Sequence, residues 1–103
     1  MKGALLSEAG LDGANLTLAD LTLADLKGAS LTRADLTATN LAGADLRQAN
    51  LTETNLNGAD LRRANLDGAE LTRADLTGAN LDGTNLTGGV GPRAPANVAG
   101  WLR

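Results

Sequence analysis

The sequence has 103 residues, a formal net charge of −3, no cysteine, no histidine and one aromatic residue, Trp101. A chain of this length forms one domain at most, and neither disulfides nor the usual zinc and haem ligand sets can stabilise it. Nucleophilic triads and acid/base histidines are excluded as well, so we expect a protein that is not an enzyme and that has no cofactor and no metal site.

The charge is distributed unevenly along the chain. Between residues 4 and 88, twelve acidic residues face six basic ones, which gives this segment a net charge of −6. An acidic body argues against direct nucleic-acid binding, which needs clustered Lys or Arg. No apolar stretch has the length of a signal peptide or a membrane span, so we expect a soluble, cytoplasmic protein without membrane contact.

The first stretch, residues 1–9, already follows a five-residue spacing. Ala4 and Leu6 occupy the places that hold a small residue and a leucine in every later repeat. Leu5, however, occupies a place that is usually Asp or Asn. We predict that residues 1–9 form an N-terminal cap that continues into the repeat, because the end units of stacked arrays need altered faces.

Residues 10–88 form the repeat itself, in which leucine returns at every fifth position. An α-helix cannot use this period, because five residues advance a side chain by roughly 500° and would scatter the leucines around the helix. In a strand, side chains alternate, so the small residue and the leucine two places later point to the same side. Since five is odd, the chain has to turn a corner once per repeat. Glycine at many fifth positions supports this corner: Gly13, Gly28, Gly43, Gly58, Gly68, Gly78, Gly83 and Gly88.

Short straight pieces joined by corners wind into a coil. Four sides would stack residues twenty apart, like neighbouring parallel strands; three sides remain an alternative on spacing alone. The sequence resembles the pentapeptide repeat family, whose motif is A(D/N)LXX, in the stretches ANLTLADLTLADL, ADLRQANL and ADLTGANLDGTNL. The resemblance covers residues 4–88 and implies an all-β fold, a right-handed quadrilateral parallel β-helix of slightly more than four coils.

The last stretch, residues 89–103, loses the repeat and contains Gly and Pro, which mark a boundary. Three interpretations are open for it. Its apolar residues, Trp101 among them, cover the last coil as a cap; the segment is a flexible tail; or Trp101 forms a dimer contact.

Two kinds of outward residue stand out as candidate sites. Leu18 and Leu23 occupy corner positions of adjacent repeats, not far from Leu5. Leu18 and Leu23, together with Leu5 and Trp101, form our predicted interaction surface, because clustered exposed apolar residues mark contact sites. The alternative for Leu18 and Leu23 is contact with the N-terminal cap.

Polar columns also run along the predicted rod. One face carries Asp35 and Asp75 without any cation and is predicted to be an acidic face, although such side chains more often bond along the stack and to turn backbones than to a ligand. Another face stacks acidic and basic residues at its corners, which predicts a surface ion-pair ladder of little energetic value: Arg33, Glu53 and Arg73.

Three inward positions hold threonine where the pattern has alanine: Thr39, Thr54 and Thr84. Each brings a hydroxyl into the interior. Because a buried hydroxyl needs a hydrogen-bond partner, we expect each to bond a backbone carbonyl or a water molecule.

The function that we predict is a non-enzymatic protein-interaction or structural module with an unidentified protein partner. A homodimer through a coil end or through the C-terminal tail is left open. The family resemblance implies an alternative, a DNA mimic that binds a type II topoisomerase such as gyrase and protects it from quinolones; the long, strongly acidic, Phe-centred members carry that activity, whereas every centre here is Leu. A further alternative is an idealised or engineered repeat array.

Overall fold

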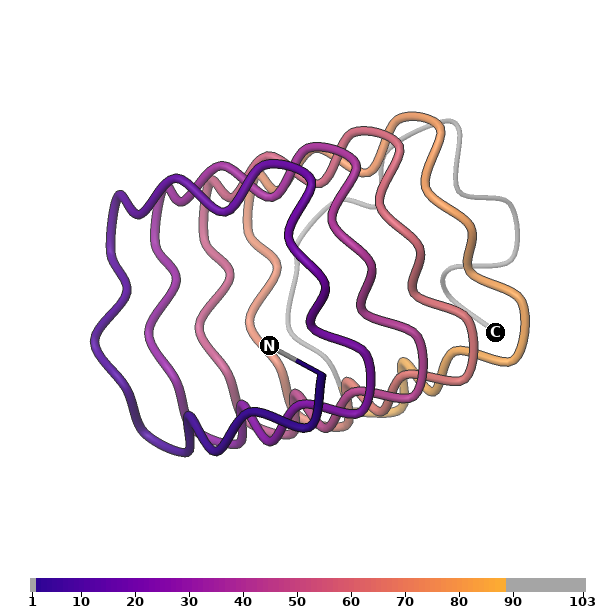
Figure 1. The fold of residues 1–103 in the computed structure, drawn as a ribbon, viewed down its shortest axis with the longest axis horizontal. Coiled ribbons are helices and arrows are strands. Elements are labelled where there is room, and N and C mark those ends of the chain that lie inside the picture. Colours follow the sequence, from indigo (N-terminus) through magenta and orange to yellow (C-terminus); the bar gives the residue numbers. More distant parts are fainter. Residues whose placement is uncertain (1, 89–103) are drawn as a thin grey trace.

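The computed structural model describes residues 2–88, which wind into a four-sided coil whose turns lie side by side along the long axis of the molecule (Figure 1). The principal extents are 30 × 20 × 20 Å. The described residues contain neither a helix nor a continuous strand; each side of the coil contributes one isolated parallel β-bridge. Met1 and residues 89–103, with the predictions made for Trp101, lie outside the described residues.

The bridges decide the number of sides. Every bridge joins residues twenty apart, from Leu5 with Asp25 to Asn65 with Asn85. Four repeats therefore complete one coil, as predicted, and a three-sided coil is excluded. Residues 2–9 take part in the same geometry as the later repeats, since Leu5 already pairs with the coil above it.

Each corner is a β-turn that the leucine begins. The leucine carbonyl accepts a hydrogen bond from the N–H three residues later, as in the 3.0 Å bond from Ala9 N to Leu6 O. Every corner residue, which is every fifth residue from 3 to 88, has a φ between 56° and 73°. The residue before it does not have a positive φ. Positive φ at only the second central residue is the type II pattern.

Half of the corner residues are not glycine, although they share this left-handed conformation. Among them are Leu18, Arg33 and Ala38, with φ values of 63°, 59° and 56°. Such a conformation costs a non-glycine residue about 1 to 2 kcal/mol. The stacked coils impose it, because the N–H of the corner residue donates to a carbonyl of the next coil, as in the 3.0 Å bond from Leu18 N to Thr37 O.

Three backbone hydrogen bonds per side join neighbouring coils. On one side, Leu26 N donates to Asp45 O at 2.8 Å, Gly28 N donates to Arg47 O at 2.9 Å, and Asp45 N donates to Ala24 O at 2.9 Å. The same set repeats from side to side. Adding one coil thus satisfies the backbone groups of the previous one, which is how a nearly strand-free chain meets its hydrogen-bonding requirement.

The leucines and small residues form one continuous core. From Leu21 to Leu76 every leucine of the repeat is buried, with at most 3% of its surface exposed. Leucines at both ends of the described rod are only partly buried: Leu6, Leu11, Leu16, Leu81 and Leu86.

The three inward threonines satisfy their hydroxyls as predicted. Thr39, Thr54 and Thr84 donate to leucine carbonyls one coil below, at 2.8, 2.7 and 2.6 Å. Thr39 and Thr54 are fully buried. A polar atom can therefore replace a methyl group inside the rod, because the turn carbonyl lies within reach of it.

Truncation of a core leucine is predicted to destabilise the fold in proportion to the burial of that leucine. Leu46→Ala removes a fully buried side chain and is expected to lower the free energy of unfolding by about 2 to 5 kcal/mol. Leu11→Ala, in the first coil, should cost clearly less because Leu11 is only partly buried. Urea denaturation followed by far-UV circular dichroism measures both. Equal losses would contradict the burial gradient.

Two substitutions at stacked corner residues, 38 and 58, are predicted to change stability in opposite directions. Gly58→Ala adds a Cβ that meets no atom within 4 Å, so only its φ of 66° opposes it, and we expect a loss of about 1 kcal/mol. Ala38→Gly relieves the same strain one coil below and should stabilise by a similar or smaller amount. Melting curves of the two variants should shift in opposite directions; shifts of the same sign would show that backbone strain is not the cause.

Candidate interaction surface

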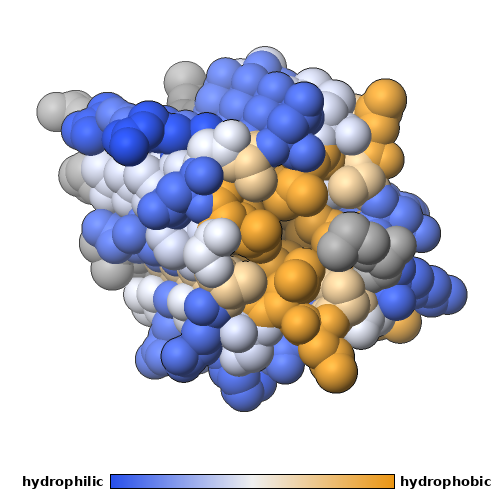
Figure 2. Space-filling view, turned by 60° about the vertical axis from the view of Figure 1, so that its left-hand side comes forward, coloured by the Kyte–Doolittle hydropathy of each residue, from blue (hydrophilic) through white to orange (hydrophobic). Residues whose placement is uncertain are grey.

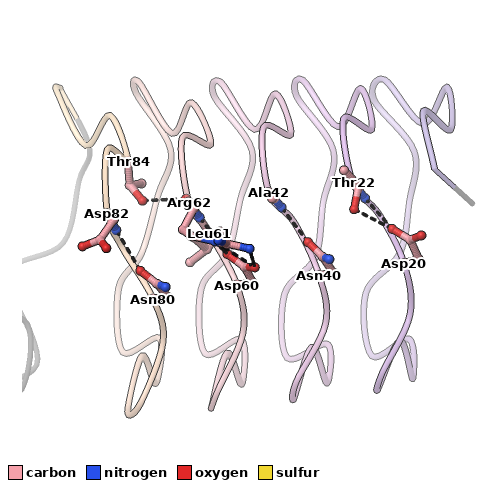
Figure 3. Close-up of polar contacts among 10 residues, drawn as sticks. All are labelled: Asp20, Thr22, Asn40, Ala42, Asp60, Leu61, Arg62, Asn80, Asp82 and Thr84. Atoms are coloured by element: carbon pink, nitrogen blue, oxygen red, sulfur yellow. Dashed lines mark hydrogen bonds and ion pairs between the residues drawn. The ribbon is translucent and has the colours of Figure 1, made fainter.

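We name the residue before each leucine, every fifth residue from 5 to 85, the polar position. Most side chains at this position form a hydrogen bond with the turn of their own repeat. Each Asp or Asn there accepts, through Oδ1, the N–H of the residue two places later. The four examples on one side are Asp20, Asn40, Asp60 and Asn80, at 3.0 to 3.1 Å (Figure 3). The same bond recurs on the other sides at 2.9 to 3.2 Å. The Asp/Asn preference thus has a structural cause, since the turn N–H needs an acceptor.

At Ser30 the acceptor comes from another coil. Ser30 occupies the polar position but does not accept from Thr32 N. Instead, Asp12 reaches up from the coil below, where its Oδ1 accepts from Thr32 N at 3.0 Å and from the Ser30 hydroxyl. The Ser30 bond is the main cause that lowers the pKa of Asp12.

Two arginines are locked onto aspartates of their own repeats. Arg47 donates to Asp45 through Nε and Nη2 at 2.9 and 2.7 Å, and Arg62 donates to Asp60 in the same way at 2.9 and 2.6 Å (Figure 3). These side-chain bonds are the main reason why the pKa of each aspartate is lowered and that of each arginine is raised. Bidentate pairing places each guanidinium in one orientation and neutralises its charge locally.

The predicted ion-pair ladder is confirmed. One carboxylate oxygen of Glu53 accepts from Arg33 Nη1 at 3.5 Å, and the other accepts from Arg73 Nε at 3.0 Å. All three residues lie in one corner column, twenty residues apart. Because both arginine side chains remain about 70% exposed, the ladder contributes little to stability but displays two positive groups on one edge of the rod.

Both aspartates of the predicted acidic face are hydrogen-bonded within the rod. Asp35 Oδ1 accepts from Thr37 N at 3.0 Å and from the Thr37 hydroxyl at 2.6 Å, and Asp75 bonds Thr77 in the same manner. The Asn57 amide, in the orientation that satisfies its neighbours, donates to Asp75 Oδ1 at 3.0 Å. The threonine hydroxyls are the main cause of the lowered pKa values of both aspartates.

Asp and Asn alternate along this face, so that uncharged residues separate the two carboxylates. Asn15, Asp35, Asn55 and Asp75 follow one another at successive bridges. Since stacked residues lie about 4.8 Å apart, adjacent carboxylates would repel each other. Where two aspartates do stack, at Asp25 and Asp45, basic residues accompany them at the adjacent turn positions. The face therefore presents two separated negative charges and no continuous acidic stripe.

The three predicted apolar residues that lie among the described residues, Leu5, Leu18 and Leu23, are on the surface. Leu5, Leu18 and Leu23 expose 87%, 76% and 59% of their surface, so Leu18 and Leu23 are not covered by residues 2–9. Figure 2 shows apolar surface gathered over the end of the rod where the first coil lies. The partly buried leucines of that coil belong to this surface. The three exposed leucines stand out in the sequence, whereas the partial burial of Leu6, Leu11 and Leu16 does not, because these leucines occupy the same place in the motif as all the others.

Other kinds of site find no support in the described part of the chain. Among residues 2–88, no cluster of three or more acidic or other metal-binding side chains could hold an ion. Within the same residues, no helix is long and apolar enough to cross a membrane.

The carboxylate bonds predict acid sensitivity. Because the pKa values of Asp35 and Asp75 lie below the usual 3.8 in the folded chain, their stabilising contribution is complete above that pH and is lost as pH falls through the lowered values. The double variant Asp35→Asn, Asp75→Asn keeps the Oδ1 acceptor but does not titrate. Thermal melts below pH 4 should show a smaller acid-induced loss of stability than in the wild type; an identical loss would mean that these carboxylates do not contribute.

Comparisons with known proteins agree with this geometry. A family model described as "Pentapeptide repeats (8 copies)" matches residues 1–37, 29–68 and 49–88. A search of curated proteins finds no match.

Several solved structures are similar to the chain. The pentapeptide repeat protein Rfr23 from the cyanobacterium Cyanothece 51142 is 42% identical with a TM-score of 0.85, covering 86% of this chain and 60% of its own. A pentapeptide repeat protein from Nostoc Pcc 7120 is 44% identical with a TM-score of 0.72, covering 73% and 62%. The chain thus spans about three-fifths of the length of these proteins. The fluoroquinolone resistance protein QnrB1 is 28% identical, covers 85% of this chain and 48% of its own, and has a TM-score of only 0.44, which is too low to support an argument.

Proposed function

Because the chain belongs to the pentapeptide repeat family, we propose that it is a non-enzymatic interaction module, a right-handed rod of slightly more than four coils that presents fixed side-chain columns to a protein partner. The observation that supports this best is that surface side chains are held by hydrogen bonds within their own repeats. Arg47 and Arg62 are held by bidentate bonds, and the polar position is held by the turn N–H groups. Surface groups that are already ordered lose little entropy on binding.

The distribution of charge favours a protein over a nucleic acid as the partner. Two arginines of the acidic body are already paired with Asp45 and Asp60, so they offer phosphates little net positive charge. Phosphate binding depends on unpaired, clustered cations that release counterions. The cytoplasm remains our expected location, and a membrane is not an expected partner.

The DNA-mimic alternative receives less support. Mimicry of a duplex requires regularly spaced negative charge, whereas the acidic face carries only Asp35 and Asp75, and Asp45 and Asp60 are neutralised by their arginines. We therefore expect no inhibition of gyrase supercoiling, and no protection from a quinolone, when the protein is titrated in large excess. Inhibition at near-stoichiometric protein would overturn this expectation and favour the alternative.

Capture of partners by surface variants tests the proposed function. The ladder variant is Arg33→Glu with Arg73→Glu, and the apolar variant is Leu18→Arg with Leu23→Arg, which uses a residue that corners already accept at positions 33, 63 and 73. The immobilised wild type and both variants are exposed to the same extract, with circular dichroism as a check of folding. A partner should bind the wild type and lose at least tenfold in affinity for one variant only. Equal binding by all three proteins would show that these surfaces do not recognise it.

A further inference from the structure

One turn of the rod lacks the acceptor that its neighbours have. From Thr17 to Thr87, the N–H of the residue after each repeat leucine donates to a side-chain oxygen, with the exception of the N–H of Thr72. Among residues 2–88, neither this N–H nor the Thr72 hydroxyl has a hydrogen-bond partner. Two donors of one turn are therefore free to bind an oxygen from another molecule.

The missing acceptor has a cause in the sequence. Glu70 occupies the polar position of this repeat, and its longer side chain does not accept from Thr72 N. The coil below cannot supply the oxygen either. Asp12 does so for Thr32, twenty residues later, but the residue twenty places before Thr72 is Thr52, whose hydroxyl donates within its own repeat.

The other turns show which group fits at Thr72. In one of them, Asp20 Oδ1 accepts from Thr22 N at 3.1 Å and from the Thr22 hydroxyl at 2.6 Å (Figure 3). The turn at Thr72 is the same, since Ala74 N donates to Leu71 O at 3.0 Å as in the other corners. Thr72 can therefore hold one carboxylate or amide oxygen in the way that Thr22 holds Asp20.

The next residue, Arg73, favours a carboxylate over an amide. Its Nε donates to Glu53 at 3.0 Å, and its side chain is 69% exposed. Its two Nη atoms have no partner among residues 2–88. Two donors of a guanidinium are thus available beside the turn, and hydrogen bonds between a guanidinium and a carboxylate are stronger than bonds between neutral groups.

An earlier repeat shows that a corner arginine acts on a carboxylate at its turn. Asp60 and Arg63 occupy the same places as Glu70 and Arg73. The pKa of Asp60 is lowered mainly by its hydrogen bond with Arg62, and the charge of Arg63 lowers it further. We expect Arg73 to act in the same way on a carboxylate that is bound at Thr72.

We propose that Thr72 and Arg73 bind a carboxylate group, which an Asp or Glu side chain of the protein partner supplies. One oxygen accepts from the N–H and the hydroxyl of Thr72, and the other accepts from Arg73 Nη atoms. This inference rests on the interaction role proposed above and names the chemistry of the partner. Glu70, which is exposed and forms no ion pair among residues 2–88, opposes the second negative charge, so binding should be weak and reversible.

Nuclear magnetic resonance on the isotope-labelled full chain tests the site, with sodium acetate as the probe and sodium chloride at equal ionic strength as the reference. The Thr72 amide and the Arg73 Nε–H signals should shift saturably with acetate and not with chloride. The Thr52 amide, which already donates to Asn50, should not respond. A wild type without a saturable shift at Thr72 overturns the proposal.

Two conservative changes at residue 70 give the sharpest contrast. Glu70→Asp keeps the charge and supplies the Oδ1 acceptor that the other turns have, so it should fill the site and weaken acetate binding by at least about tenfold. Glu70→Gln leaves the site open and removes the opposing charge, so it should strengthen binding. Because Glu70→Asp completes the turn, it should melt no lower than the wild type. Unchanged acetate binding by Glu70→Asp overturns the proposal.

A third variant tests the arginine. Arg73→Gln introduces a residue that a corner already accepts at Gln48 and should weaken acetate binding by about tenfold, the value of a hydrogen bond to a charged group. Arg33→Gln, the same change in the same column, is the matched control, because the turn N–H at Thr32 already has Asp12 as its acceptor. Equal effects of the two changes would contradict a site at Thr72.

The source of the carboxylate is tested with a model of a protein side chain. Aspartate blocked at both ends of its backbone should shift the same signals as acetate, and blocked asparagine should bind more weakly. Binding of acetate without binding of blocked aspartate overturns the assignment to a partner side chain. A captured partner that binds Glu70→Asp as well as the wild type also overturns it but leaves the proposed interaction function in place. Absence of any captured partner rejects that function and leaves the acetate result in place.

Discussion

The structure depends on one conformational constraint, a left-handed corner residue in every repeat. An odd period sends successive leucines to opposite faces unless the backbone reverses this once per repeat. The β-turn does so, and all corner residues from 3 to 88 share its positive φ. The coil, the stacking of residues twenty apart and the continuous leucine core all follow from that turn. The strain at non-glycine corners shows that stacking between coils is strong enough to impose it.

The same turn explains most of the polar surface. A turn N–H that faces outward needs an acceptor, and the Asp or Asn before the leucine supplies it through Oδ1. At Ser30, which does not accept this bond, Asp12 from the coil below accepts it instead. Many residues that resemble a ligand-binding array in sequence therefore have a structural role. The groups that remain for recognition are those that the turn does not need.

These remaining groups lie at the corners and at the end of the rod. Corner residues carry the Arg33, Glu53 and Arg73 ladder and the exposed Leu18 and Leu23, and the repeat leucines at the start of the described rod are only partly buried. A rod of this kind can change its surface without changing its fold, because corner side chains point outward and contribute little to the core. This separation of roles suits an interaction module.

The sequence by itself determined the repeat, the inward leucines, the corner in each repeat and the ladder at Glu53, because each of these follows from local periodicity and from side chains at a set spacing. It also showed that Thr39, Thr54 and Thr84 need hydrogen-bond partners, but the structure identified these partners as leucine carbonyls. Four sides instead of three, the direction of the Asp/Asn bonds toward the turn, and the locking of Arg47 on Asp45 were decided by the tertiary structure, since they depend on distances between coils and on side-chain orientation. The exposed first coil was also decided there. Leu11 and Leu31 occupy the same place in the motif, and only stacking distinguishes a leucine with a coil on both sides from a leucine with a coil on one side.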